Sequence, residues 1–183
     1  MTDQEVAGTG EGRAGPLTCL PILLYDGICG LCNRSVQFIL RHDRSAIFRF
    51  ASLQSSFAAG ILSRHGADPA DLDTVYVLAP AGEEKLDRKA LQGTAARDTK
   101  SSYSPELQDR PPEVLLARSD AVIFVLRQLG GVWQALAVLL WLIPRPLRDW
   151  GYGVVAHYRY RIFGRYDSCP VPSAETRARF LDQ

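Results

Sequence analysis

Two cysteines, Cys29 and Cys32, have the spacing of a dithiol redox couple. They follow an apolar, strand-like run (residues 22–25) that ends in Asp26-Gly27, and they precede a stretch typical of a helix. Unpaired N–H groups and the dipole at a helix N-terminus stabilise a thiolate, which is the reactive form of cysteine. The order strand, turn, Cys-x-x-Cys and helix therefore predicts a thioredoxin-like redox site.

Within this couple we expect Cys29 to be the nucleophile and Cys32, almost a turn further into the helix, to be the buried resolving thiol. Asp26 stands three residues before Cys29 and admits two roles. One is to accept the Cys32 proton during resolution, and the other is an Asx-type turn that binds the amides after it. Gly27 is expected to support the same turn.

A Cys-x-x-Cys pair is also half of a structural zinc site. The remaining cysteines, Cys19 and Cys169, stand alone, and the three histidines form no His-x₃₋₅-His pair. Redox chemistry without a cofactor is therefore favoured, with a metal-binding module formed by Cys29, Cys32 and Cys169 as the alternative. In the redox interpretation Cys169 is a candidate third thiol, whereas Cys19 is interpreted as incidental.

The length and composition are ordinary for one globular domain, with 183 residues, 46% of them hydrophobic and 22% charged. The net charge of +1 gives no reason to expect a nucleic acid partner. The N-terminus lacks the apolar stretch of a secretory signal, so we expect a disordered leader over residues 1–17 and a cytoplasmic protein. Catalytic disulfides in that reducing compartment are transient. The predicted partners are protein or small-molecule thiols and disulfides.

Hydrophobic patterns predict the elements that position the thiols. Strands are expected at residues 22–25, 47–50, 75–79 and 113–117, and helices at residues 33–42, 52–65, 120–129, 132–143, 147–162 and 173–180. A parallel first pair and an antiparallel last pair of strands predict an α/β fold with a thioredoxin-like mixed four-stranded sheet flanked by helices. We interpret residues 18–131 as this core, with an exposed polar insertion at about 83–112, and residues 132–183 as a C-terminal helical extension packed on the core.

Two serines precede predicted helices. Ser52 is a candidate N-cap of the second helix, and Ser119 is a candidate N-cap of the third. Because Ser119 and Asp120 open a helix at the sheet edge that carries the thiols, a direct role beside the dithiol is the alternative to capping.

The C-terminal extension combines apolar, aromatic and basic residues. Residues 132–143 are almost wholly apolar but too few to span a bilayer, which needs about 20 residues, so a buried helix is predicted. Three tryptophans and five arginines lie between residues 133 and 165. We interpret these helices as a cap with its apolar face on the sheet and its arginines in solvent. Docking on a membrane or partner through the Trp/Arg helices is the alternative, and peripheral membrane contact is not favoured.

The residues around the thiols also resemble a known family. The Asp-x-x-Cys-x-x-Cys motif of the DCC family of predicted thiol-disulfide oxidoreductases is similar to residues 26–33, Asp-Gly-Ile-Cys-Gly-Leu-Cys-Asn. The similarity continues through residues 48–54, 118–121 and 158–165 and covers roughly residues 20–181. This resemblance implies a thioredoxin-like fold and a redox activity, and it implies little about the substrate.

Overall fold

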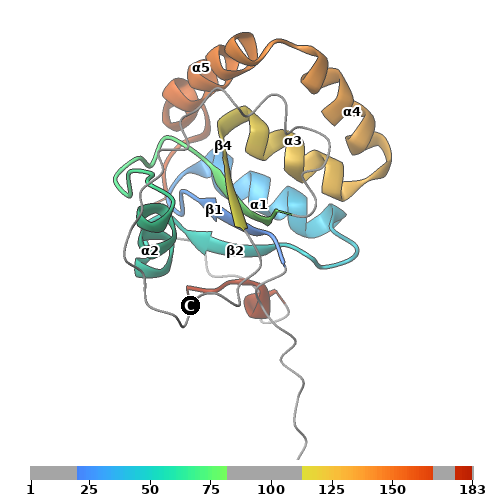
Figure 1. Cartoon of the computed structure of the whole chain (residues 1–183). Helices are drawn as coiled ribbons and strands as arrows, with labels where there is room; N and C mark the ends of the chain where they lie inside the picture. The colour runs from blue at the N-terminus through green and yellow to red at the C-terminus, as the bar shows by residue number, and fades with distance from the viewer. Residues whose placement is uncertain (1–19, 82–112, 167–175, 183) are drawn as a thin grey trace, which may run out of the picture.

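The computed structural model describes residues 20–81, 113–166 and 176–182. The elements in these ranges follow the predicted order (Figure 1). They are β1 (Ile22–Tyr25), α1 (Gly30–His42), β2 (Arg49–Ser52), α2 (Ser56–Arg64), β3 (Tyr76–Pro80), β4 (Glu113–Ala117), α3 (Arg118–Leu129), α4 (Gly131–Leu142), α5 (Arg145–Phe163) and a 3₁₀ turn at Arg177–Arg179. Four features named in the sequence analysis lie outside the described residues: the predicted leader, the insertion at about 83–112, Cys19 and Cys169.

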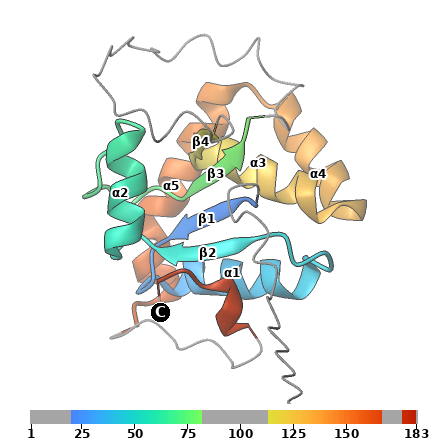
Figure 2. The same cartoon turned by 60° about the horizontal axis from the view of Figure 1, so that its bottom comes forward.

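The four strands form one mixed sheet in the order β2-β1-β3-β4 (Figure 2). β1 is parallel to β2 and antiparallel to β3, and β3 is antiparallel to β4. In this register Leu23 of β1 stands between Phe50 of β2 and Val77 of β3. The predicted thioredoxin-like α/β arrangement is confirmed.

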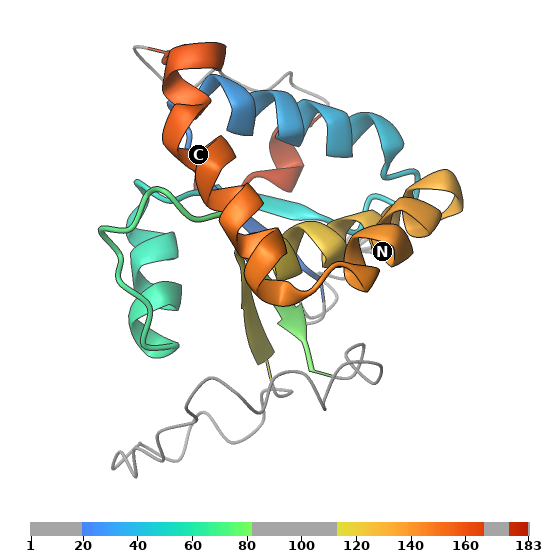
Figure 3. The same cartoon turned by 90° about the horizontal axis from the view of Figure 1, so that it is seen from above.

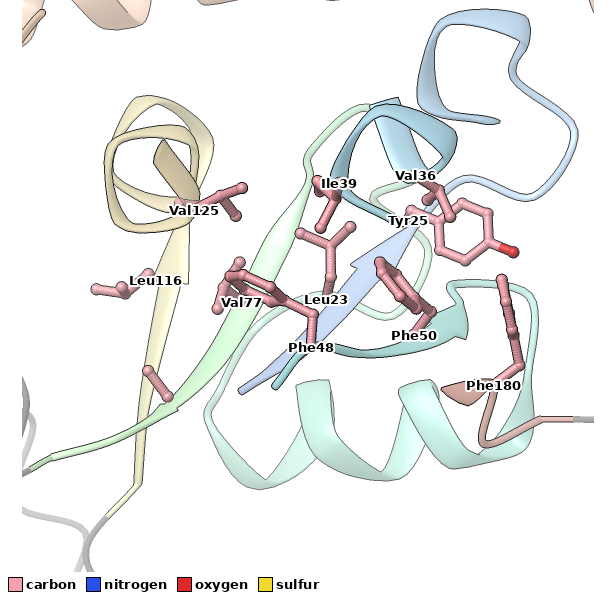
Figure 4. Close-up of a cluster of buried hydrophobic side chains, with 12 residues drawn as sticks. Leu23, Tyr25, Val36, Ile39, Phe48, Phe50, Val77, Leu116, Val125 and Phe180 are labelled. Carbon is pink, nitrogen blue, oxygen red and sulfur yellow. The ribbon is translucent and has the colours of Figure 1, made fainter. Parts of the chain in front are cut away.

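Helices cover both faces of the sheet, which is why β1 reads as a continuous apolar run. Leu23 and Tyr25 point to the face covered by α1 and α3, and they pack there with Phe48, Phe50 and Phe180 (Figure 4). Leu24 points to the opposite face, where it packs against residues of α2. Because β1 is buried on both faces and α1 packs on one of them, the loop between β1 and α1 is fixed in place. This loop carries Cys29.

Both predicted serine caps are wrong. Ser52 pairs with Tyr25 as the last residue of β2, so α2 starts only at Ser56, and Ser55 is its N-cap. The Ser55 Oγ accepts a hydrogen bond from the Ala58 N–H at 3.2 Å. β4 runs directly into α3 with no intervening loop, which puts Ser119 inside the first turn and leaves α3 without a side-chain cap.

The C-terminal helices are present but are packed differently from the prediction. α4 lies against α3, and α5 runs from the end of α4 across α3 to α1 (Figure 3). Within α4 only Ala137 is buried, because its contact with α3 is narrow, and Val132 is 71% exposed. The prediction of a buried helix is therefore wrong. None of the described helices is both long and apolar enough to cross a membrane.

The predicted distribution of arginines in this extension is also partly wrong. The side chains of Arg148 and Arg159 are only 10% and 3% exposed, and they pair with the half-buried Asp120 and the buried Asp26, respectively. The apolar side chains of α4 and α5 are instead the more exposed ones, with Trp150 at 69%.

Candidate active site

Cys29 occupies the N-cap position of α1, which begins at Gly30 rather than at Asn33. Its sulfur accepts a hydrogen bond from the Cys32 N–H at 3.4 Å. An N-cap side chain faces the unpaired N–H groups of the first helical turn, so negative charge on the Cys29 sulfur is stabilised there. The predicted placement of the first thiol at a helix N-terminus is confirmed.

The two thiols have opposite acidity. The pKa of Cys29 is lowered to about 6, chiefly by the hydrogen bond from the Cys32 thiol, then by the Cys32 N–H and by the positive charge of Arg159, while burial opposes the shift. The pKa of Cys32 is raised, first because its proton is held by Cys29, and then because of burial and the negative charge on Cys29. At neutral pH the pair therefore holds one proton, with the thiolate on Cys29.

Asp26 is buried at the end of β1, with 1% of its side chain exposed, and its carboxylate accepts four hydrogen bonds. One oxygen accepts from the Ile28 N–H at 3.1 Å, which is the predicted Asx-type turn, and from the Gln54 amide at 2.8 Å. The other accepts from the Arg159 guanidinium at 3.3 Å and from the Tyr160 hydroxyl. Asp26 thus ties the dithiol loop to α5.

Arg159 is a site residue that sequence analysis missed. Its Nη2 lies 3.3 Å from Asp26 and 3.0 Å from Asp73, and it donates to the Leu72 carbonyl at 2.8 Å. This buried positive charge lowers the pKa of Cys29. The available signal was its position within residues 158–165, one of the blocks that carry the family resemblance.

Two further polar residues hold the turn before the thiols. The Gly27 N–H donates to the Gln54 Oε1 at 3.1 Å, and the Gly27 carbonyl accepts from the Asn33 side chain at 2.7 Å. The same Asn33 amide donates to the Cys29 carbonyl at 3.0 Å. Gly27 therefore supports the loop as predicted, and Gln54 and Asn33 are additional positioning residues.

A short strap, residues 164–166, closes over Cys29. The Gly30 N–H donates to the Gly164 carbonyl at 3.1 Å, and the Tyr166 N–H donates to the Ile28 carbonyl at 2.8 Å. A Cβ at position 30 would overlap the Phe163 carbonyl oxygen, so this approach requires glycine.

The strap changes which thiol solvent can reach. Cys29 is 0% exposed, whereas Cys32 is only partly buried. Cys32, which was predicted to be buried, is therefore the more accessible of the two thiols, although its pKa is still raised, first by the hydrogen bond to Cys29 and then, as predicted, by burial. The strap residues are themselves exposed.

Ser119 and Asp120 attach α5 to α3. The Ser119 hydroxyl donates to the Asp149 carboxylate, and Asp120 accepts from Arg145 at 2.9 Å and from Arg148 at 3.2 Å. Ser119 also lines an apolar cavity whose wall includes Cys32. The structure thus brings Ser119 to the same cavity as Cys32, while Asp120 pairs with the two arginines.

The metal-binding alternative finds no support in the part of the chain that the structure describes. Within it, no three His, Cys, Asp or Glu side chains are grouped so that they could hold a metal ion. Cys169, the third proposed ligand, lies outside the described residues.

Comparison with known proteins agrees with this geometry. The family described as DCC1-like thiol-disulfide oxidoreductase matches residues 23–165. The chain is 32% identical over 160 residues to the uncharacterized protein YuxK of Bacillus subtilis, covering 87% of this chain and 93% of that protein. It is also 32% identical over 149 residues to the DCC family protein At1g52590, chloroplastic, of Arabidopsis thaliana, covering 81% of this chain and 68% of that protein. No solved structure matches significantly. The chain therefore belongs to the DCC1-like thiol-disulfide oxidoreductase family.

Proposed function

We propose that this protein catalyses thiol–disulfide exchange through the Cys29/Cys32 couple, with Cys29 as the nucleophile and Cys32 as the resolving thiol. The observation that carries the proposal is the position of the Cys29 sulfur at the N-cap of α1, where it accepts the Cys32 N–H at 3.4 Å. A pKa of about 6 makes Cys29 mostly thiolate at neutral pH, while the raised pKa keeps Cys32 protonated. Membership of the family supports a redox role in general terms.

The exchange proceeds in two displacements. The Cys29 thiolate attacks one sulfur of a partner disulfide, a bond forms between these two sulfurs, and the other partner sulfur leaves as a thiolate. Cys32 then loses its proton and attacks the Cys29 sulfur, which closes the Cys29–Cys32 disulfide and releases the second partner sulfur. The Cys32 proton neutralises one of the two departing thiolates, and the other takes its proton from water.

The neighbouring residues have positioning roles in this proposal. Arg159 stabilises the Cys29 thiolate, and Asp26 holds Arg159 in place by an ion pair in which both side chains are almost fully buried. With four donors already on its carboxylate, Asp26 is better placed as an anchor than as a free base, and its role as acceptor of the Cys32 proton stays a prediction. The strap must move aside before a large disulfide can reach Cys29.

The proposed substrates are protein or small-molecule disulfides, as the family description implies in general terms. A cytoplasmic location stays a prediction, and the name of the Arabidopsis relative places that protein in the chloroplast. The same chemistry works in either compartment when thiols are kept reduced.

A trapping experiment tests the division of roles. In a background with Cys19 and Cys169 replaced by serine, Cys32→Ser should accumulate a mixed disulfide on Cys29 when glutathione disulfide is added, because resolution is blocked. Cys29→Ser in the same background is the matched control and should trap little. Peptide mapping by mass spectrometry locates the adduct. Equal trapping on Cys32 in the control, or none in either variant, would refute the assignment.

A further inference from the structure

A large cavity has Cys32 in its wall and no residue of the strap. It measures about 620 Å³ and is lined by residues of α1, α3 and α5 and by the end of α4, the four helices that Figure 3 shows in one group. Cys32 forms part of its wall, together with apolar side chains such as Phe38, Val125 and Leu140. This volume lies in the range of small-molecule binding sites, and the wall selects an apolar ligand.

One side chain of the cavity wall has unused hydrogen-bond donors. Arg148 lines the cavity, its side chain is 10% exposed, and its Nε and Nη1 atoms are buried with no acceptor among the described residues. Leaving such donors unpaired is costly, so a bound acceptor would be favourable. The charge of Arg148 is already balanced, because Arg148 and Arg145 face Asp120 and Asp149. A neutral carbonyl oxygen therefore suits this position better than a further anion.

The mouth of the cavity is apolar as well. Ile143, Leu147 and Trp150 line it and are 37%, 57% and 69% exposed. Exposed large apolar side chains around a cavity favour a ligand that arrives from a lipid phase rather than a polar metabolite.

From these observations we infer that the cavity binds a lipophilic quinone and that the dithiol reduces it to the quinol. A quinone combines an apolar ring with carbonyl acceptors, and it takes up two electrons and two protons. The thiolate–thiol pair supplies both electrons and one proton when it becomes a disulfide, and water supplies the other proton. The binding part of this inference stands on the cavity alone, and the reduction rests on the proposed function of Cys29 and Cys32.

The electron balance follows from the positions of the two sulfurs. The Cys32 sulfur, which lines the cavity, adds to a ring carbon, and its proton passes to a quinone oxygen. The Cys29 thiolate then attacks the Cys32 sulfur, the S–S bond forms and the C–S bond breaks. The electron pair remains on the ring as the quinol anion, which takes one proton from water.

Two glycines of α5 provide a matched test. Gly151 lines the cavity, and a Cβ added there meets no atom within 4 Å, so Gly151→Leu should fill the cavity without strain. Gly153 is equally unobstructed but is not part of the wall, so Gly153→Leu is the control. The probe is a fully substituted benzoquinone with a decyl tail, and binding is read from the quenching of the protein's tryptophan fluorescence, to which Trp150 at the cavity contributes. Gly151→Leu should weaken binding about tenfold or more, and Gly153→Leu should leave it unchanged.

The donor and the redox step are tested separately. Arg148→Met should weaken quinone binding by about tenfold, the loss expected for one or two hydrogen bonds. Cys29→Ser should bind the quinone normally and form no quinol. Quinol formation is followed by its ultraviolet absorbance, and one quinol should appear per disulfide.

The outcomes separate this inference from the proposed function. Exchange with glutathione disulfide but no quinone binding would overturn the inference and leave the proposed function intact. Equal effects of Gly151→Leu and Gly153→Leu, or a long-chain carboxylate that binds in place of the quinone, would also overturn it. If the wild type binds the quinone but neither reduces it nor exchanges disulfides, both the reduction step and the proposed function are overturned.

Discussion

Replacing Cys32 by alanine should raise the pKa of Cys29, because the hydrogen bond from the Cys32 thiol is the largest cause of its low value of about 6. Cys32→Ser keeps an O–H donor at the same position and is the matched control. Both variants are made in a background with Cys19 and Cys169 replaced by serine, so that Cys29 is the one remaining thiol.

The expected size of the effect follows from the strength of that bond. A hydrogen bond to a charged group contributes about 1.5–3 kcal/mol, and one pKa unit corresponds to about 1.4 kcal/mol. The pKa of Cys29 should therefore rise by about one to two units in Cys32→Ala and by less in Cys32→Ser. At pH 7 the thiolate fraction should fall from about nine-tenths to between about a half and a tenth in the alanine variant.

The assay is an ultraviolet titration of the thiolate, which needs no reagent to pass the strap. Rates of alkylation against pH give a second reading, in which the alanine variant should react more slowly near pH 6. At high pH it should react about threefold to tenfold faster, because a thiolate of higher pKa is more nucleophilic. Coincident titration curves for the alanine and serine variants would refute the hydrogen-bond account of Cys29 acidity.

Three further outcomes are expected. Asp26→Asn should lower the free energy of unfolding in urea by about 3 kcal/mol, since it leaves the Arg159 charge buried with no buried partner; unchanged stability would contradict the ion pair. If Asp26 accepts the Cys32 proton, the same variant should slow resolution more than the first attack in stopped-flow exchange. Gly30→Ala should displace the strap and speed alkylation of Cys29 by a bulky reagent more than by a small one, and equal rates with the wild type would show that the strap does not limit access. The reduced protein should gain stability as the pH rises from 6 to 8.5 and lose it as the pH falls through 6. The reason is that the pKa of Cys29 in the folded state lies below its unfolded value of about 8.5. The urea midpoint of the oxidised form, which has no Cys29 thiol to titrate, should lack this dependence.

The fold was predictable where local patterns decide it. The apolar run of β1, the helical stripe of α1 and the lack of a helical pattern in the sequence between β3 and β4 were enough to predict the mixed sheet. The position of Cys29 at a helix N-terminus followed from the same patterns. The serine caps failed because sheet pairing holds Ser52 in β2 and a direct strand-to-helix connection places Ser119 inside α3, and neither effect is visible in a local window.

The parts of the site that were missed depend on contacts between distant segments. Arg159 comes 133 residues after Asp26, and sequence alone gave no reason to bury one arginine of a basic segment. The strap covers Cys29 only because α5 ends beside the start of α1, so the accessibility of the two thiols could not be read from their spacing. The exposed apolar surface of α4 likewise depends on how little of that helix α3 covers.

A redox titration tests the central claim most directly. The protein with serine at positions 19 and 169 is equilibrated with defined ratios of reduced and oxidised glutathione, and the Cys29–Cys32 disulfide is quantified by mass spectrometry. A working couple should oxidise and reduce reversibly along a single two-electron curve, about 30 mV per tenfold change in the ratio of disulfide to dithiol. A protein whose Cys29 and Cys32 form no disulfide across the full range, or form one that cannot be reduced again, would contradict the claim that this pair is a thiol–disulfide exchange centre.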